Sequence, residues 1–291
     1  MNIDRARALA IVKAALKEDI GKGDVTTGPL IDDISSSKAV IVSREDCVVC
    51  GLEIAELAMS AVDYSVRFKP ACGDGDLIGA GKDVAFIEGH TASILRSERT
   101  MLNFLTFLSG ISTRTRQYID RVKPYGVKIT DTRKTIPLLR YLEKYAVSVG
   151  GGTNHRMGLY DRVLIKDNHI HCRKTAGRAR AGDFSLKSLV AEARKKNRKG
   201  IIVEIEVSTI EEFNDALRGS PDIIMLDNMK AHEINACVEI RKLSKIRPLL
   251  EASGGITLET VRDYAKTGVD MISVGELTDS VRAIDMSLEF V

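Results

Sequence analysis

A repeat of short apolar runs, which begins near residue 127, is the feature that most constrains how this chain can fold. Each run ends in a polar residue or a glycine, and most are followed by a segment of helical periodicity. From Glu206 onward the run ends lie between 21 and 26 residues apart, about the length that one strand and one helix need in an α/β barrel. The runs are VKIT ending near Asp131, RVLI ending at Lys166, IIVEIEV containing Glu206, DIIML ending at Asp227, PLLEA leading to Ser253, and DMISV leading to Gly275.

This spacing predicts a parallel α/β barrel, in which the carboxyl ends of the strands share one rim and form the active site. A doubly wound sheet also brings strand ends together and is the alternative fold. The interval before Glu206 is longer and includes residues 172–183, a basic stretch that we interpret as a loop insertion. The polar residues at the run ends are therefore the first candidates for a functional site.

The part of the chain before residue 127 has a different pattern. Residues 3–18 and 91–118 carry apolar side chains at helical spacing. Short apolar segments at 38–43, 48–49 and 66–68 predict strands, which glycine-rich turns interrupt. Strands combined with helices in this way favour an α+β layer domain.

The composition excludes several classes of protein. The 43 Lys and Arg nearly balance the 40 Asp and Glu, and aromatic residues make up only 5%, without Trp, so we expect no nucleic-acid partner. No apolar run approaches the roughly 20 residues that span a bilayer, and no secretory signal is visible, so we expect no membrane partner. Five scattered cysteines predict a reduced, cytoplasmic protein.

Basic side chains gather after predicted strands and after the triple glycine at 150–152. Arginine binds carboxylate and phosphate oxygens two at a time, and lysine acts as a point charge. The alternative is that each is a solvated surface cation, since Lys and Arg are mostly exposed. Their clustering predicts a site for a substrate with several negative charges. The residues are Arg133, Lys134, His155, Arg156 and Lys166.

Two carboxylates at successive strand ends, Glu206 and Asp227, supply the opposite charge. They could hold Mg²⁺, accept hydrogen bonds from ribose hydroxyls, or stabilise a cationic transition state. The alternative is that they balance the neighbouring cations. Glu204 lies two residues before Glu206, so it should share the same face of the strand and could be equally involved.

Two glycine turns predict a phosphate site. The turn Ser253-Gly254-Gly255 and the turn at Gly275 each follow an apolar run, and we expect helices after them at 258–267 and 281–288. Backbone N–H groups at such turns bind phosphate, and the last two loops of an α/β barrel often do so. A lone glycine turn is commonly structural, so the pairing of the two carries the prediction.

Other patterns do not support a site. The glycines at 73–81 match neither a dinucleotide fingerprint nor a Walker loop. Cys47 and Cys50 form a CxxC without a second pair, which favours a buried strand or turn over zinc. His169 and His171 lack matching ligand partners, and we interpret His169 as part of a loop.

Taken together, the motifs resemble the quinolinate phosphoribosyltransferase family, also called nicotinate-nucleotide pyrophosphorylase (carboxylating). The resemblance covers essentially the whole chain, in the order and approximate spacing of that family. The motifs are EDIGKGDVTT (18–27), SERTMLNFLTFLSGIST (97–113), DTRKT (131–135), EKYAVSVGGGTNHR (143–156), LIKDNHI (164–170), VEIEV (203–207), IIMLDN (223–228), EASGGI (251–256) and ISVG (272–275).

The resemblance implies an α/β fold made of an N-terminal α/β sandwich domain and an open parallel α/β barrel. The sandwich is expected over residues 1–110, with the C-terminal residues 276–291 returning to it. The barrel, as the catalytic domain, is expected over residues 111–275.

The resemblance also implies an enzyme of NAD biosynthesis that converts quinolinate and phosphoribosyl diphosphate, with Mg²⁺, into nicotinate mononucleotide, diphosphate and CO₂. Catalysis is assigned to Lys134, Lys166, Glu206 and Asp227. The substrate-binding set adds Arg99, Arg133, His155, Arg156, Ser253, Gly254, Gly255 and Gly275. In this set Arg133, His155, Arg156 and Lys166 bind the quinolinate carboxylates, and Glu206 and Asp227 hold the ribose hydroxyls and the metal. Arg99 reaches a neighbouring subunit, in a homodimer or hexamer.

Three departures from the family pattern stand out: Ile136-Pro137-Leu138 where Thr-Pro-Gly is common, Glu276 where a small residue is usual, and a basic stretch at 173–180. A related protein associated with molybdenum transport shares many of the motifs and is the alternative reading. A nicotinate or nicotinamide phosphoribosyltransferase is disfavoured, because a neutral ring substituent would leave buried cations unpaired.

Overall fold

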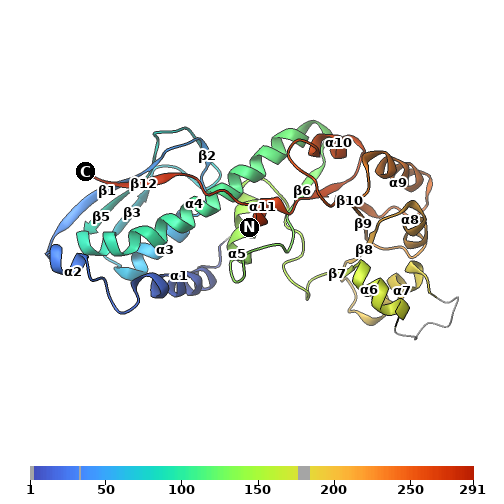
Figure 1. The fold of residues 1–291 in the computed structure, drawn as a ribbon, viewed down its shortest axis with the longest axis horizontal. Helices are drawn as coiled ribbons and strands as arrows, with labels where there is room; N and C mark the ends of the chain where they lie inside the picture. Colours follow the sequence, from blue (N-terminus) through green and yellow to red (C-terminus); the bar gives the residue numbers. More distant parts are fainter. Residues whose placement is uncertain (1–2, 33, 176–183) are drawn as a thin grey trace. The chain divides into compact units, whose positions relative to one another are not determined.

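The computed structural model describes residues 3–32, 34–175 and 184–291 (Figure 1). They form two compact units. The first contains Met1–Arg116, Lys134–Gly152 and Leu277–Val291, and the second contains Gln117–Arg133 and Thr153–Glu276.

The segment at 134–152 therefore groups with the first unit, whereas the expected division at residue 110 placed it in the barrel. Close packing against helix α4 (Thr91–Val122) explains this. Ser112 Oγ donates a hydrogen bond of 2.8 Å to the carbonyl of Ala146 in helix α5 (Arg140–Val149). A Cβ at Gly150 would come within 2.5 Å of the Ser112 carbonyl oxygen, so only glycine permits this approach.

An antiparallel four-stranded sheet forms the centre of the first unit, in the order β12-β1-β5-β3. The C-terminal strand β12 pairs with β1, and Ile41 lies opposite Leu288. Helix α1 begins after Asp4, whose carboxylate accepts the N–H groups of Ala6 and Arg7, and it packs on α3. The elements are α1 (Arg5–Ile20), α2 (Thr27–Leu30), β1 (Ser36–Ser43), β2 (Cys47–Val48), α3 (Leu52–Val62), β3 (Arg67–Pro70), β4 (Leu77–Ile78), β5 (Asp83–His90) and β12 (Met286–Phe290).

The expected helix at 281–288 is wrong, because this segment leads into strand β12. Met286, Leu288 and Phe290 alternate with Ser287 and Glu289, and this is the period of a strand. Pairing with β1 then fixes the extended conformation. The helix that does follow Gly275 is α11 (Glu276–Asp279), which is only 4 residues long.

Six parallel strands form the sheet of the second unit, in the order β6-β11-β10-β9-β8-β7. Within the described residues β6 and β7 are its two edges and do not pair, so the barrel is open. The prediction of an N-terminal α/β sandwich domain plus an open parallel α/β barrel is confirmed: the chain has a six-stranded parallel sheet and a separate domain with an antiparallel sheet. The elements are η1 (Lys123–Tyr125), β6 (Lys128–Thr130), β7 (Val163–Ile165), α6 (Asp167–Thr175), α7 (Leu186–Lys196), β8 (Val203–Val207), α8 (Ile210–Leu217), β9 (Ile223–Asp227), α9 (Ala231–Leu243), β10 (Leu249–Ser253), α10 (Val261–Lys266) and β11 (Met271–Ser273).

The two faces of the parallel sheet differ sharply in chemistry. Residues that pair in register point to the same side, and side chains alternate along each strand. One face carries Ile205, Ile224 and Ala252, which are buried. Helix α8 packs against β8 and β9, and α10 packs against β11. The other face carries polar residues, and these are Glu204, Glu206, Asp227, Glu251, Ser253 and Ser273. The predicted site residues Glu206, Asp227 and Ser253 lie on this second face, together with the apolar residues Ile223, Met225 and Met271.

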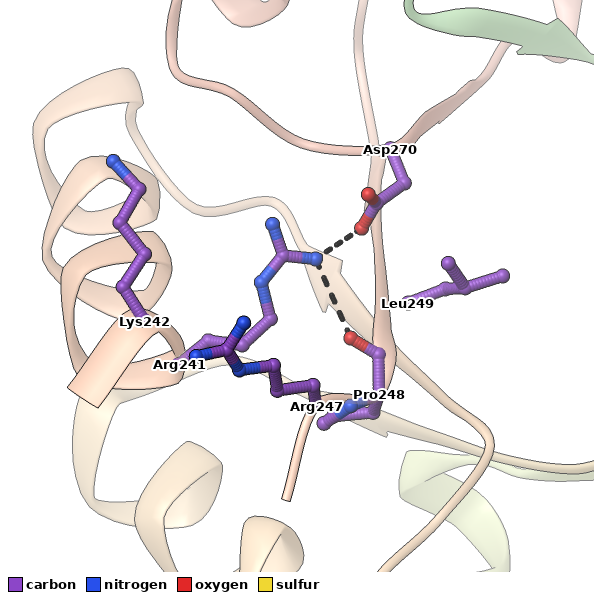
Figure 2. A pocket seen from close by; sticks show the side chains of 6 residues that line it. All are labelled: Arg241, Lys242, Arg247, Pro248, Leu249 and Asp270. Carbon is purple, nitrogen blue, oxygen red and sulfur yellow. Dashed lines mark hydrogen bonds and ion pairs between the residues drawn. The ribbon is translucent and has the colours of Figure 1, made fainter. Parts of the chain in front are cut away.

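A basic cluster lies at the opposite, amino-terminal ends of the strands (Figure 2). Arg241 from α9 forms an ion pair with Asp270 and donates to the carbonyl of Pro248. The Asp270 carboxylate also accepts the N–H of Leu250 at 2.7 Å. Arg241 thus ties α9 to the starts of β10 and β11, which is a structural role. The pocket there is lined by Arg241, Lys242, Arg247, Pro248, Leu249 and Asp270.

Several smaller expectations are settled by the structure. Cys47 and Cys50 are free and buried, as predicted for the isolated CxxC. His169 was expected in a loop but lies in α6, where its Nδ1 accepts the Lys166 N–H at 2.9 Å. The expected loop insertion begins instead as the end of that helix, and residues 176–183 lie outside the described residues. Among the described helices, none is long and apolar enough to cross a membrane.

Candidate active site

The carboxyl ends of four neighbouring strands of the second unit carry predicted site residues on one face. Lys166 follows β7, Glu206 lies in β8, Asp227 ends β9 and Ser253 ends β10. Ser253 lies directly opposite Asp227, and Glu206 opposite Met225, so Glu206 is one side-chain row below Asp227. The structure therefore brings these residues to one edge of the sheet.

Glu206 is the buried member of a charged group at this edge. It is 7% exposed, and its carboxylate lies 3.3 Å from the Lys166 ammonium. Burial raises the pKa of Glu206, the negative charge of Asp227 adds to the rise, and Lys166 opposes it. Two carboxylates and one ammonium are thus close enough to influence one another. Hard oxygen ligands on adjacent strands fit a magnesium ion, which favours carboxylates.

The segment that carries His155 and Arg156 is fixed by Asp131 at the end of β6. One Asp131 oxygen accepts the His155 backbone N–H at 2.8 Å, and the other accepts the Asn154 side-chain amide at 2.7 Å. Thr153 bridges to Thr130 and extends the strand pattern. Asp131 is fully buried, and its two hydrogen bonds fix the position of residues 154–155 relative to the end of β6.

Arg156 is an unusual cation because it is 7% exposed. It donates to the carbonyl of Arg162 at 3.3 Å. Burial lowers the pKa of Arg156, and the positive charge of Arg133 lowers it further. The two guanidinium groups therefore lie near enough to repel one another. A bound anion would relieve that repulsion.

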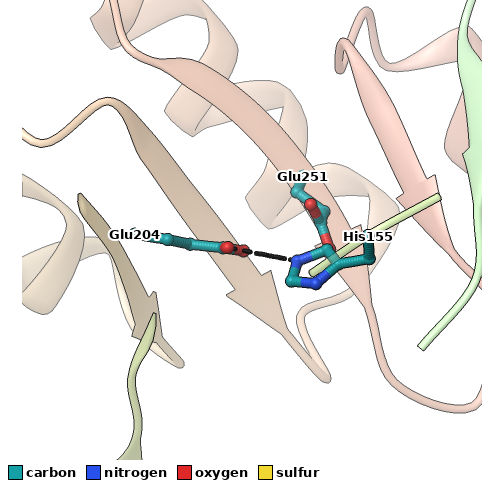
Figure 3. Close-up of side chains that lie close together, drawn as sticks. All are labelled: His155, Glu204 and Glu251. Carbon is teal, nitrogen blue, oxygen red and sulfur yellow. Dashed lines mark hydrogen bonds and ion pairs between the residues drawn. The ribbon is translucent and has the colours of Figure 1, made fainter. Parts of the chain in front are cut away.

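A buried cluster of His155, Glu204 and Glu251 lies deeper on the same face (Figure 3). His155 Nε2 is 3.1 Å from Glu204 Oε2 and 3.6 Å from Glu251 Oε1. Arg162 Nη1 donates to Glu204 at 3.2 Å. Both glutamates are fully buried, and His155 is 8% exposed. The imidazole and the two carboxylates, which are groups that could bind a metal ion, thus converge on one point inside the open barrel.

Glu251 has an incomplete set of partners. Ser273 donates to its Oε1, and Thr130 and Ser273 share a hydrogen bond of 2.7 Å. Its Oε2 atom is buried and has no hydrogen-bond partner among the described residues. Burial and the nearby charge of Glu204 raise the pKa of Glu251 to about 7, while His155 opposes the rise.

Glu251, Ser273 and Arg162 were not found from the sequence. A signal for Glu251 was present, since a charged residue in the apolar run PLLEA lies two positions before Ser253 and must share its face. The same reasoning correctly linked Glu204 to Glu206. Arg162 gave no signal, because a single arginine before a strand is typical of a surface.

The glycine turn after β10 is shaped by contact with Asn228, the residue after Asp227. A Cβ on Gly254, at φ +99°, would lie 2.6 Å from Asn228 Cγ and 2.8 Å from Asn228 N. The Asn228 N–H donates to the Ser253 carbonyl at 2.8 Å, and its side chain donates to Asp227 at 2.6 Å. Gly254 therefore allows the predicted phosphate turn and the Asp227 carboxylate to lie side by side.

The structure supports the second glycine turn, at Gly275, less strongly as a phosphate site than the sequence suggested. Gly275 is followed by a helix of 4 residues rather than by the expected longer one. Glu276, whose charge was unexpected there, accepts a hydrogen bond from the Tyr118 hydroxyl. That contact gives the charge a local partner.

Two predicted site residues, Lys134 and Arg99, belong to the first unit. The Lys134 carbonyl accepts a hydrogen bond from Thr278 Oγ1 at 2.6 Å, and its side chain is exposed. Arg99 is exposed on α4. Their roles toward substrates stay predictions.

Comparison with known proteins identifies the family. The model of the quinolinate phosphoribosyl transferase N-terminal domain matches residues 24–109, and that of the C-terminal domain matches residues 111–289. The chain belongs to the quinolinate phosphoribosyl transferase family. Its resemblance to this family, inferred from the motifs, is thereby confirmed.

Individual members of the family are similar in sequence to this chain over most of their length. The probable nicotinate-nucleotide pyrophosphorylase [carboxylating] of Methanocaldococcus jannaschii is 40% identical over 290 residues, covering 98% of this chain and 97% of the relative. The Bacillus subtilis protein of the same name is 39% identical, covering 94% and 89%.

Solved structures of proteins with the same name are also similar to this chain. The nicotinate-nucleotide pyrophosphorylase of Francisella tularensis has a TM-score of 0.91 at 36% identity, covering 100% of this chain and 98% of that chain. Human nicotinic acid phosphoribosyltransferase has a TM-score of 0.62 at 11% identity, covering 97% of this chain and 74% of that chain, which shows a shared fold alone.

Proposed function

We propose that this protein transfers the phosphoribosyl group of phosphoribosyl diphosphate to quinolinate with loss of CO₂, giving nicotinate mononucleotide and diphosphate in NAD biosynthesis. Membership of the quinolinate phosphoribosyl transferase family supports this assignment. The observation that carries it is the approach of basic and acidic groups at one edge of the sheet, where Lys166 lies 3.3 Å from Glu206. Arg133 and Arg156 lie near enough to repel one another, and Glu206 and Asp227 lie on neighbouring strands.

The basic set suits an acidic aromatic substrate. Arg133, His155, Arg156 and Lys166 would bind the two carboxylates of quinolinate. Arginine forks match planar carboxylates, and a buried guanidinium gains most from an anionic partner. Binding would orient the pyridine nitrogen toward the anomeric carbon of the sugar. Lys134 would add a contact to the substrates.

The acidic pair suits the sugar donor. Glu206 and Asp227 would hold the ribose hydroxyls and stabilise the positive charge that develops at the anomeric carbon as diphosphate leaves. A magnesium ion held by these two carboxylates would neutralise charge on the diphosphate. The turn at Ser253, Gly254 and Gly255, together with Gly275, would take the ribose phosphate.

Decarboxylation needs little further help from the protein. Once its nitrogen is bonded to the sugar, the pyridine ring is cationic, and loss of the adjacent carboxylate is favoured. We therefore assign no obligatory general base, and positioning and charge stabilisation supply the catalysis. The active form would be a homodimer or hexamer, in which Arg99 reaches the site of a neighbouring subunit. A cytoplasmic location fits the cysteine usage.

A substrate-pair assay tests the proposal. The protein is mixed with Mg²⁺, phosphoribosyl diphosphate and either quinolinate or nicotinate, and nicotinate mononucleotide and CO₂ are measured. We expect both products from quinolinate, and no mononucleotide from nicotinate. Equal turnover of nicotinate would refute the substrate assignment. No observation on this chain favours the molybdenum-transport alternative.

A further inference from the structure

The pocket at the amino-terminal ends of the strands takes no part in the proposed reaction (Figure 2). Its volume is about 310 Å³, which lies within the range of small-molecule sites. Glu206 and Asp227 lie at the opposite, carboxyl ends of β8 and β9. A ligand in this pocket is therefore separate from the proposed quinolinate site.

The pocket contains more positive than negative charge. Arg241 and Asp270 form an ion pair and neutralise one another. Lys242 pairs at 2.8 Å with Glu239, but these side chains are 61% and 68% exposed, so water screens the pair. Arg247 has no ion-pair or hydrogen-bond partner among the described residues, and in Figure 2 its side chain extends toward the helix that carries Lys242. Two cations are thus available to a ligand.

The loops around the pocket are strongly basic. Five connections lead into β6, β8, β9, β10 and β11 at this end of the sheet, and together they carry fourteen Lys and Arg against two Asp. That leaves 29 Lys and Arg against 38 Asp and Glu in the rest of the chain. Backbone hydrogen bonds join neighbouring connections, from the Lys128 N–H to Asp270 and from the Leu249 N–H to Asp222. The connections are 121–128, 194–202, 218–222, 241–248 and 266–270.

Helix dipoles explain only part of this excess. Lys and Arg in the last turn of a helix offset the partial negative charge there, and the effect falls off beyond that turn. Arg241 and Lys242 lie in the last turn of α9 and fit this explanation. Arg198, Lys199 and Arg247 lie beyond the ends of α7 and α9, where no helix dipole requires them. The fields of these loops add together and raise the local concentration of anions at the pocket.

We propose that this pocket is a second binding site, and that it takes a nucleoside polyphosphate. The phosphates contact Lys242 and Arg247, since an ammonium group attracts phosphate as a point charge and a guanidinium fork binds two of its oxygens. The nucleoside lies against Leu249, an apolar side chain that lines the pocket and is 46% exposed. Inorganic phosphate has no group for Leu249, and an uncharged ligand has none for the cations. The site does not depend on the proposed reaction, so binding alone tests it.

Calorimetric titration with ATP tests the site, and Lys245 provides a matched control. Arg247→Ala should weaken ATP binding about tenfold, the loss expected for one charge-assisted contact. Lys245→Ala removes a charge from the same loop, but Lys245 does not line the pocket, so ATP affinity should change less than twofold. Both side chains are exposed, so neither substitution should unfold the protein, and thermal melting checks this. Absence of ATP binding to native protein, or equal losses in the two variants, would overturn the proposal.

Inorganic triphosphate tests the class of ligand. Native protein should bind ATP more tightly than triphosphate, and Leu249→Ser should remove that difference, because the nucleoside loses its apolar contact. Equal affinities for the two ligands in native protein would contradict the nucleoside.

Lys166→Ala tests whether ATP binds elsewhere. Lys166 belongs to the proposed reaction site and does not line the pocket, so this substitution should leave ATP affinity within about twofold. A loss as large as that in Arg247→Ala would place the ATP at the reaction site and refute a second one.

Discussion

Gly254→Ala is the substitution whose effect can be worked out most directly from the structure. The residue has φ +99°, which an L side chain rarely adopts. The added methyl would lie 2.6 Å from Asn228 Cγ and 2.8 Å from Asn228 N, well inside normal contact. Gly255 is a matched control, since it also has a positive φ, +59°, but a Cβ there meets nothing within 4 Å.

The two substitutions should therefore differ in magnitude. Gly255→Ala carries only the backbone penalty, about 1 kcal/mol of unfolding free energy. Gly254→Ala carries a comparable or larger backbone penalty and must also displace Asn228, so we expect about 3 kcal/mol or more. The displaced Asn228 would lose its 2.6 Å hydrogen bond to Asp227, and the KM for phosphoribosyl diphosphate should rise with it.

Urea unfolding and thermal melting measure the difference. At about 2 °C per kcal/mol for a chain of this size, Gly254→Ala should lower Tm by about 6 °C and Gly255→Ala by about 2 °C. Adding Asn228→Gly to Gly254→Ala removes the side-chain clash without strain, because Asn228 has φ 55°, and should recover part of the loss, though the clash with the backbone nitrogen remains. Equal losses for the two alanine variants would show that the contact with Asn228 does not constrain the turn.

Three further outcomes are expected. Glu206→Gln should lower kcat/KM about 100-fold and raise the Mg²⁺ concentration for half-maximal activity, because one of two oxygen ligands and a source of transition-state stabilisation is lost; an unchanged Mg²⁺ titration would count against the metal assignment. Leu138→Gly should stabilise the protein by about 1 kcal/mol in urea unfolding, because Leu138 has φ 71° and is 90% exposed, so little packing is lost; a loss of stability would contradict this. Burial raises the folded-state pKa of Glu251 to about 7, so the folded protein binds more protons than the unfolded chain between about pH 4.5 and 7. Stability should therefore fall as pH rises through that window, and fall less in Glu251→Gln, which urea unfolding at several pH values would measure.

The sequence predicted the parallel strands well because their signal is local. Each apolar run ends in a polar residue or glycine, and the strands end within a residue or two of those positions, as at Asp227 and Ser253. The helix expected at 281–288 was wrong because pairing with β1, more than 240 residues away, decides the conformation there. The grouping of 134–152 with the first unit likewise depends on the tertiary packing of Gly150 on Ser112.

The site was predicted in part for the same reason. Residues at the ends of strands, such as Lys166, Glu206 and Asp227, could be found because each is a charged residue at or near the end of one of the recurring apolar runs. Glu251 lies inside a strand, and its importance arises only where His155 meets it from a distant segment. Long-range convergence of buried charges cannot be read from local patterns.

The balance of charge inside the open barrel also bears on which substrate the site selects. Arg162 lies 3.2 Å from Glu204, and Lys166 lies 3.3 Å from Glu206, so these charges largely compensate one another. Arg156, by contrast, has its pKa lowered by burial and then by the positive charge of Arg133. A dianionic pyridine brings one carboxylate for each of these two guanidinium groups, whereas a monocarboxylate relieves only part of their repulsion. Discrimination between quinolinate and nicotinate should therefore reside chiefly in this arginine pair. Arg133→Ala should weaken quinolinate binding more than phosphoribosyl diphosphate binding, and a loss confined to the sugar donor would refute the assignment.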